Sequence, residues 1–123
     1  MKTFTEFKSE NELKPGGLKT FTKSVTFPRS GETIPAGTSL HVYFSEKIPS
    51  KVFFRGNSDN VKSILLVNAY KYFATGFTKP PGMKTLEKYS NDAIAKTPTG
   101  FKTEPDGYGE DNSPSWLLVM GLI

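Results

Sequence analysis

The sequence contains no cysteine, which excludes disulfide bonds, thiol catalysis and the usual thiolate zinc sites. Its only histidine, His41, lies in an alternating segment typical of a strand, and no nucleophile or orienting acid stands at a spacing that would serve it. No phosphate-binding loop or dinucleotide fingerprint occurs either. We therefore expect a protein that is not an enzyme and that holds no cofactor and no metal.

Long apolar runs are also absent. No stretch approaches the length of a membrane-spanning helix, and residues 1–14 lack the apolar core that a signal peptide needs. We therefore expect a protein of the cell interior, without disulfides and without a membrane partner.

Aromatic residues, by contrast, are plentiful, with ten Phe, five Tyr and one Trp in 123 residues. Such side chains bury a large area each, so one domain of this length can be stable without covalent crosslinks. The breaker cluster Lys14-Pro15-Gly16-Gly17 divides the chain. We expect residues 1–17 to form a flexible arm and residues 18–123 to form one compact domain.

Alternating apolar and polar residues predict antiparallel strands in the first half of the chain. The pattern places strands over 18–27, 39–45 and 52–55, with proline- and glycine-rich turn residues over 29–38. Residues 61–75 fit either a helix or a buried strand. Our interpretation is a strand to about residue 67, followed by a short helix through residue 73.

The second half of the chain predicts short helices around a hairpin. Residues 83–90 fit a helix, and 93–103 fit a β-hairpin with its turn at 97–100. A final helix is expected with Ser113 as its N-cap and Pro114 as its first residue. The fold class is therefore α+β, either a small SH3-like β-barrel or an antiparallel sheet, followed by short helices and a β-hairpin.

The C-terminal third of the chain carries distinctive short motifs. Glu104-Pro105-Asp106-Gly107 is followed by Pro114-Ser115-Trp116-Leu117-Leu118 and by the ending Gly121-Leu122-Ile123. This EPDG…PSWLL…GLI arrangement resembles a group of small uncharacterised proteins of bacteria and their tailed phages. The resemblance implies a phage or bacterial origin, and hence the cytoplasm of a bacterial host, but no particular activity.

A second likeness concerns the predicted helix and hairpin. Their layout is similar to the recognition helix and wing of winged helix-turn-helix DNA binders, and it rests on Leu86, Tyr89, Ile94, Thr97 and Gly100. The residues after the turn, 101–104, depart from the basic aromatic run of that family. Sequence-specific reading of DNA is therefore not implied.

The net charge of +4 is unevenly distributed, because residues 19–102 carry thirteen Lys or Arg against five acids and residues 103–123 carry four acids and no basic residue. From Lys47 to Lys102 the basic residues interleave with aromatic ones. Phosphates attract such charges, and exposed rings can stack on bases. The alternative is a lysine-rich solvated surface over an aromatic core, since only Arg29 and Arg55 are of the type favoured for bidentate contacts. We predict nucleic-acid contacts at Lys51, Arg55, Lys62, Lys71, Lys96 and Lys102.

Residues 103–123 carry acidic residues and then an apolar ending. Asp106, Glu110, Asp111 and Asn112 are oxygen ligands of the kind that calcium prefers, but their spacing does not match an EF-hand, and a solvated acidic turn is expected. The apolar segment 116–123 predicts a helix that completes the core. The alternative is a docking segment with Trp116, Leu117 and Met120 as partner contacts.

These patterns together predict a small non-enzymatic binding protein that contacts nucleic acid through a basic surface. Two alternatives stay open. One is a structural or assembly component that joins a larger particle through its C-terminal helix, and the other is an inhibitor of a host protein that uses the acidic loop. The oligomeric state is not predicted.

Overall fold

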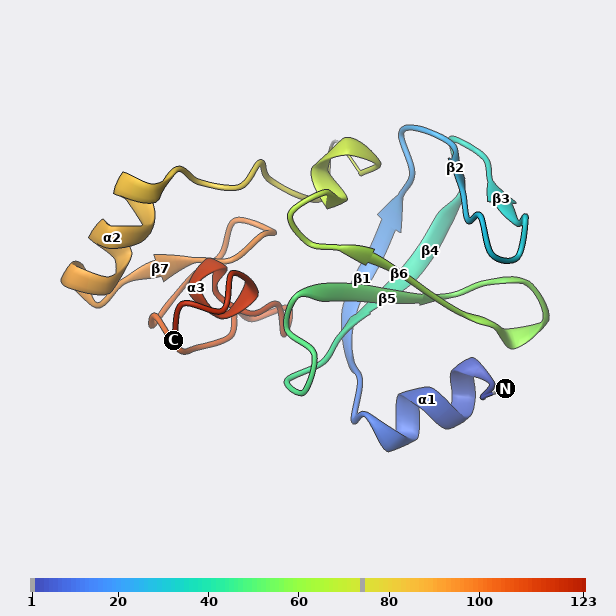
Figure 1. Ribbon diagram of the computed structural model, residues 1–123, viewed down its shortest axis with the longest axis horizontal. Coiled ribbons are helices and arrows are strands. Elements are labelled where there is room, and N and C mark those ends of the chain that lie inside the picture. The colour runs from blue at the N-terminus through green and yellow to red at the C-terminus, as the bar shows by residue number, and fades with distance from the viewer. Residues whose placement is uncertain (1, 74) are drawn as a thin grey trace.

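The computed structural model describes residues 2–73 and 75–123 as an α+β fold of antiparallel sheets and short helices (Figure 1). The predicted fold class is therefore confirmed. Of its two variants the antiparallel sheet is the one observed, because the sheet is open and the described residues form no closed barrel. No helix among these residues is long and apolar enough to cross a membrane.

The main sheet has the strand order β1-β4-β5-β6, and each neighbouring pair is antiparallel. Its strands are β1 (Lys14–Thr20), β4 (Ser39–Phe44), β5 (Lys51–Arg55) and β6 (Val61–Leu65). Only Tyr43 and Phe53 are register partners between β4 and β5. The β1–β4 ribbon consequently crosses the β5–β6 ribbon steeply at this pair (Figure 1).

The glycines of the predicted breaker cluster lie inside β1 and produce a bulge rather than a break. The register with β4 shifts between Pro15 and Gly17. A Cβ at Gly16 would overlap the ring of Phe44, so only glycine lets the strand pass this close to the core.

The strand predicted over 18–27 is interrupted. After β1 ends at Thr20, the Phe21 side chain turns into the core and the Thr22 backbone N–H donates to the Tyr72 carbonyl over 2.6 Å. The chain then forms a separate hairpin of β2 (Val25–Thr26) and β3 (Thr33–Ile34), and β3 lies within the predicted turn segment.

The inner face of the sheet packs against residues from the whole chain. In β4 and β5, Val42, Phe44, Val52 and Phe54 alternate toward this face and are fully buried. They form one cluster with buried residues of the connecting and C-terminal segments, among them Phe21, Leu66, Phe73, Phe77, Leu86, Trp116 and Leu117. The ring centroids of Phe21 and Phe73 lie 4.2 Å apart.

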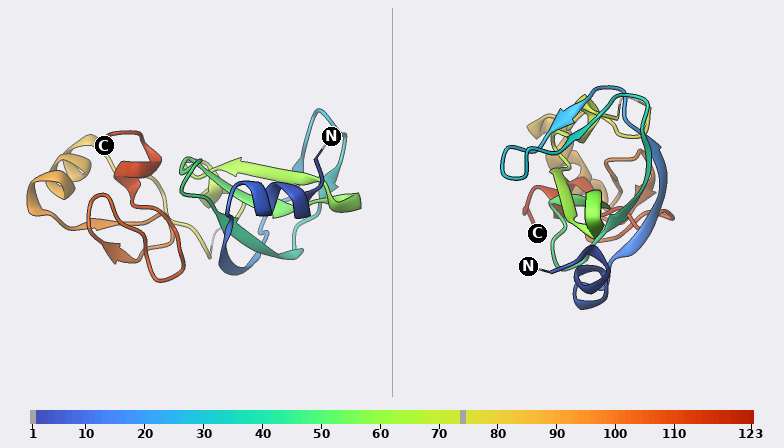
Figure 2. Two further views of the ribbon diagram at one scale, coloured as in Figure 1. Left: turned by 90° about the horizontal axis from the view of Figure 1, so that it is seen from below. Right: turned by 90° about the vertical axis from the view of Figure 1, so that its right-hand side faces the viewer.

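The outer face of the sheet is covered by helix α1 (Phe4–Glu10), which Thr3 caps through a hydrogen bond to the Glu6 N–H (Figure 2). Phe4 is buried with Leu13 and Phe53 in a second, smaller cluster. The structure thus places most of the predicted arm in α1 and β1. The sequence signal for α1 is weak because the helix is short and only Phe4 and Phe7 of its residues join this cluster.

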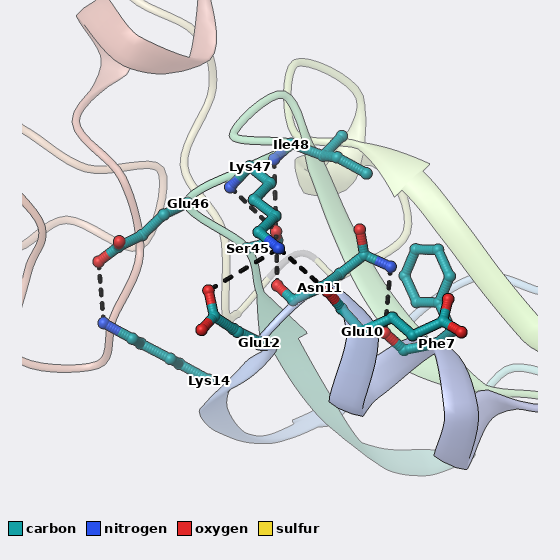
Figure 3. A network of polar contacts seen from close by, with 9 residues as sticks. All are labelled: Phe7, Glu10, Asn11, Glu12, Lys14, Ser45, Glu46, Lys47 and Ile48. Atoms are coloured by element: carbon teal, nitrogen blue, oxygen red, sulfur yellow. Dashed lines mark hydrogen bonds and ion pairs between the residues drawn. The ribbon is translucent and has the colours of Figure 1, made fainter.

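Polar contacts fix the end of α1 to the β4–β5 turn (Figure 3). The buried Ser45 hydroxyl donates to the Asn11 carbonyl and accepts from the N–H groups of Lys47 and Ile48. The Lys47 ammonium in turn donates to the Glu10 carbonyl over 3.0 Å. A single buried hydroxyl thereby orients both the turn and the helix end.

After β6 the chain forms a short 3₁₀ turn, Ala69–Lys71, so the strand-then-helix interpretation of 61–75 is confirmed for the residues described. The C-terminal region (residues 79–123) then lies at the opposite end of the long axis from α1 (Figures 1 and 2). It contains α2 (Met83–Asp92), β7 (Ala95–Lys96), β8 (Lys102–Thr103) and α3 (Trp116–Val119). The N-cap of α3 is Ser115, which accepts from the Leu118 N–H, and not Ser113 as predicted.

Candidate nucleic-acid interface

Helix α2 presents lysines to solvent because its sequence is amphipathic. Leu86 is buried and Tyr89 half-buried on the side that packs against the core. Lys84 and Lys88 are four residues apart and exposed, on the face opposite Leu86. Burial raises the pKa of the Tyr89 hydroxyl, so this ring stays neutral beside the lysines. The helix ends at Ala93, whose φ of 58° is left-handed.

The hairpin that follows α2 places two further lysines side by side. Lys96 and Lys102 are register partners, as are Ala95 and Thr103. Ala95 is fully buried, so its pair faces the interior and the lysine pair faces solvent. The connecting turn needs Gly100, whose φ is +93°.

Helix α2 and the hairpin pack together, with α3 against both. Lys84, Lys88, Lys96 and Lys102, which we call the lysine surface, therefore come from two adjoining elements. Within the described residues none of the four is in an ion pair. Their positive charge is thus available to an external anion.

The lysine surface contains two of the six predicted nucleic-acid contacts, Lys96 and Lys102. Lys51 and Arg55 lie elsewhere, on the outer face of the main sheet on either side of Phe53. Lys71 is exposed in the 3₁₀ turn after β6. The structure thus distributes the predicted contacts over separate surfaces.

Arg55 makes two contacts within the protein. Its Nε lies 2.7 Å from an Asp59 carboxylate oxygen in an ion pair, and its guanidinium lies 5.2 Å from the centre of the Phe4 ring. Burial acts to raise the pKa of Asp59, but hydrogen bonds from Thr5 and the positive charge of Arg55 outweigh it and lower the pKa. The pair therefore fastens the β5–β6 turn to helix α1.

The prediction for Lys62 is corrected by the structure. Its side chain is 9% exposed, points to the inner face, and pairs with Glu32 over 3.4 Å. The ammonium also donates to the Ser30 hydroxyl and lies over the Phe27 ring. Lys62 fixes the β2–β3 hairpin to the sheet and is not free to contact a phosphate.

The predicted partner contacts at the C-terminus are also corrected in part. Trp116 and Leu117 are 2% and 1% exposed and belong to the main core cluster, as expected for a helix that completes the core. A partner cannot reach them in this conformation. Met120 is half-buried against the same cluster, and only Leu122 and Ile123 expose large apolar area at the chain end.

Two side chains of the acidic loop, Asp111 and Asn112, are hydrogen-bonded within the protein. Asp111 accepts hydrogen bonds from the hydroxyls of Thr99 and Ser113 and from the Ser113 N–H. Asn112 donates to the Pro15 carbonyl over 2.8 Å, which ties the loop to β1. Among the residues that the structure describes, no group of three or more His, Cys, Asp or Glu could hold a metal ion.

Lys84 and Lys88 were not among the predicted contacts, although the sequence held a signal for them. Their spacing of four residues in a segment expected to be helical places them on one face. That face becomes significant only once the packing of α2 against the hairpin is known. This packing places the helix that carries them next to the hairpin that carries the lysine pair.

Comparisons with protein-family models, with curated protein sequences and with solved structures found no match for this chain. No relative therefore supplies a function. Any assignment has to rest on the residues and their arrangement.

Proposed function

We propose that this protein is a small non-enzymatic nucleic-acid-binding protein that contacts phosphates through the lysine surface. The supporting observation is the grouping of Lys84, Lys88, Lys96 and Lys102 on two adjoining elements without an acidic partner within the described residues. Phosphate contacts of this kind supply most of the affinity of non-specific complexes. The C-terminal resemblance to bacterial and phage proteins supports a place in the bacterial cytoplasm.

The chemistry of these side chains favours binding that does not depend on base sequence. Lysine acts as a flexible point charge, whereas bidentate reading of guanine edges is typically done by arginine. The only arginines, Arg29 and Arg55, lie outside the C-terminal region. We expect the lysines to position the phosphate backbone and to leave the bases unread.

The test is fluorescence anisotropy of labelled oligonucleotides of mixed sequence over a salt series. Each phosphate contact contributes roughly 0.7 to 0.9 to the slope of log affinity against log salt. Lys96→Glu with Lys102→Glu should therefore lower the slope by about 1.4 to 1.8 and weaken binding to every sequence alike. Flat anisotropy of the wild-type protein at low salt would contradict the proposal.

The matched control is Lys23→Glu with Arg29→Glu. It makes the same change of net charge on exposed residues that lie outside the C-terminal region. We expect this variant to retain nearly the full salt slope. An equal loss in both variants would show that net charge, and not the lysine surface, drives association.

A further inference from the structure

A cleft opens where the two ribbons of the main sheet diverge. It has a volume of about 420 Å³ and lies between the Tyr43–Phe53 crossing, the tip of α1 and strand β3. We call it the crossing cleft. Its lining residues are Phe4, Glu32, Thr33, Ile34, Pro35, Thr38, Leu40, His41, Tyr43, Arg55, Gly56 and Asn57. The volume falls within the range typical of small-molecule sites.

The walls of the crossing cleft are both apolar and polar. Its polar side chains come from β4 and the end of β5 (His41, Tyr43, Arg55) and from β3 and the turns (Glu32, Thr33, Thr38, Asn57). Ile34, Pro35 and Leu40 supply aliphatic surface beside the buried Phe4 ring. His41 and Arg55 lie two residues beyond the Tyr43–Phe53 pair on their strands, and both line the cleft. The exposed His41 ring and the Asn57 side chain have no hydrogen bond to other described residues.

Arg55 is the group best placed to bind an anion. Its ion pair with Asp59 is made at Nε, and within the described part of the chain its two terminal amino groups make no hydrogen bond. These groups form a planar pair of donors that matches a carboxylate or a phosphate. Glu32, the acid in the lining, is already neutralised by Lys62 and accepts from the Asn57 N–H over 2.9 Å.

The turn that follows Arg55 and carries Asn57 is held in a fixed and strained conformation. Ser58 and Asp59 have φ values of 56° and 60°, which are unfavourable for residues other than glycine. The Thr5 hydroxyl donates to Asp59 over 3.0 Å and holds the loop against α1. Gly56 approaches the Lys62–Glu32 pair so closely that a Cβ would overlap the Lys62 side chain. The donors are thus oriented before any ligand arrives.

We propose that the crossing cleft binds a small organic oxyanion, with a planar apolar group against Ile34, Pro35 and Leu40 and its carboxylate or phosphate on Arg55. The proposal does not depend on the lysine surface, because the cleft is built from the main sheet, α1 and β3. Asp59 shares the charge of Arg55, so the affinity belongs in the high-micromolar to millimolar range. His41 and Asn57 would add hydrogen bonds to the same anion.

The test is a ¹H–¹⁵N correlation titration of the full chain with benzoate, phenyl phosphate and inorganic phosphate. Both aromatic probes should give saturable shifts at Gly56, Asn57 and His41, and inorganic phosphate should bind at least about tenfold more weakly because it lacks the apolar group. Tighter binding of phenyl phosphate would identify a phosphate ester as the ligand class. Tighter binding of benzoate would identify a carboxylate.

Arg55→Lys keeps the charge opposite Asp59 but removes the fork, and should weaken both aromatic probes by about tenfold or more. Arg29→Lys is the matched control and should leave the titration unchanged. His41→Ala provides a second variant that does not touch the Asp59 pair, and should weaken binding less. The proposal is overturned if neither aromatic probe saturates, if inorganic phosphate binds as tightly as they do, or if the two arginine variants behave alike.

Discussion

The main-sheet half (residues 2–73 and 75–78) and the C-terminal region differ in whether their basic residues form ion pairs. In the first, Lys2, Lys14, Lys47, Arg55 and Lys62 are all in ion pairs, and Lys8 and Lys19 lie over aromatic rings. In the second, the lysine surface makes no ion pair within the described residues. Within the described residues, ion pairs of basic side chains therefore occur in the first region only, although Lys23, Arg29 and Lys71 are exposed there as well.

The two regions also differ in how their backbone is organised. The main sheet relies on strands of five to seven residues and one buried ion pair. The C-terminal region has two-residue strands and relies on a hydroxyl network in which Thr99 contacts Thr97, Asp111 and Ser113. The main core cluster contains residues of both. The two regions are therefore stabilised by different local interactions but share one hydrophobic core.

The largest expected effect is the loss of unfolding free energy when a residue of the shared core cluster is truncated. Trp116→Ala removes a side chain that is 2% exposed and should lower the free energy of unfolding by about 3–5 kcal/mol. Because the cluster spans both regions, denaturant unfolding followed by circular dichroism should remain a single transition at a lower midpoint. Phe101→Ala, at an exposed ring, is the control and should cost much less. Loss of only the C-terminal region would show that the regions fold separately.

The next effect concerns the buried ion pair of the sheet. Lys62→Met keeps the shape but leaves the Glu32 carboxylate buried without its cation, which should cost about 3 kcal/mol of unfolding free energy. Adding Glu32→Leu should recover much of this loss, since the uncompensated charge disappears. Chemical denaturation of the single and double variants measures both. If the single variant shows no loss, the pair does not link the hairpin to the sheet.

A smaller effect appears on acidification. The pKa of folded Asp59 lies below its ordinary value of 3.8, so its charge stabilises the fold above that pH and this contribution disappears as the pH falls through the folded value. Asp59→Asn should therefore be less stable than wild type at neutral pH, and the difference should shrink below pH 3.8. Thermal unfolding at a series of pH values measures this. A difference that is constant with pH would contradict the assignment.

The smallest expected effect separates the two groups of predicted contacts. Lys51→Gln with Lys71→Gln changes basic residues outside the lysine surface and should alter the affinity for oligonucleotides only slightly. Lys84→Gln with Lys88→Gln removes the same charge from α2 and should weaken binding several-fold more. Anisotropy at one fixed salt concentration compares them directly. The reverse order would move the interface to the main sheet.

Sequence patterns predicted those elements that are marked by apolar–polar alternation or by turn residues within their own segment. Alternation identified β4 and β5, and the turn residues between Thr97 and Gly100 identified the hairpin. Helix α1 and the interruption after Thr20 were missed, because both depend on contacts distant in sequence. In helix α1, Phe4 is buried in one cluster with Phe53 of strand β5. After Thr20, the Thr22 backbone N–H donates to the Tyr72 carbonyl.

The candidate site was less predictable than the fold, for an electrostatic reason. The sequence does not distinguish a strand lysine that faces solvent from one that is buried in an ion pair. Lys96 is of the first kind, and Lys62, which pairs with Glu32 beside the β2–β3 hairpin, is of the second. Burial and pairing decide the difference, and both arise only on folding. The crossing cleft has no sequence signature at all, because it results from the angle between two ribbons.

The single tryptophan also makes the molecule its own optical reporter. Trp116 lies in the shared interior at 2% exposure, so its emission should be shifted to the blue in the native state. Oligonucleotides on the lysine surface or small anions in the crossing cleft would leave that emission nearly unchanged, since neither reaches the ring. Detachment of α3 would shift it to the red. Ligand binding and loss of the C-terminal packing can thus be followed separately in one unlabelled sample.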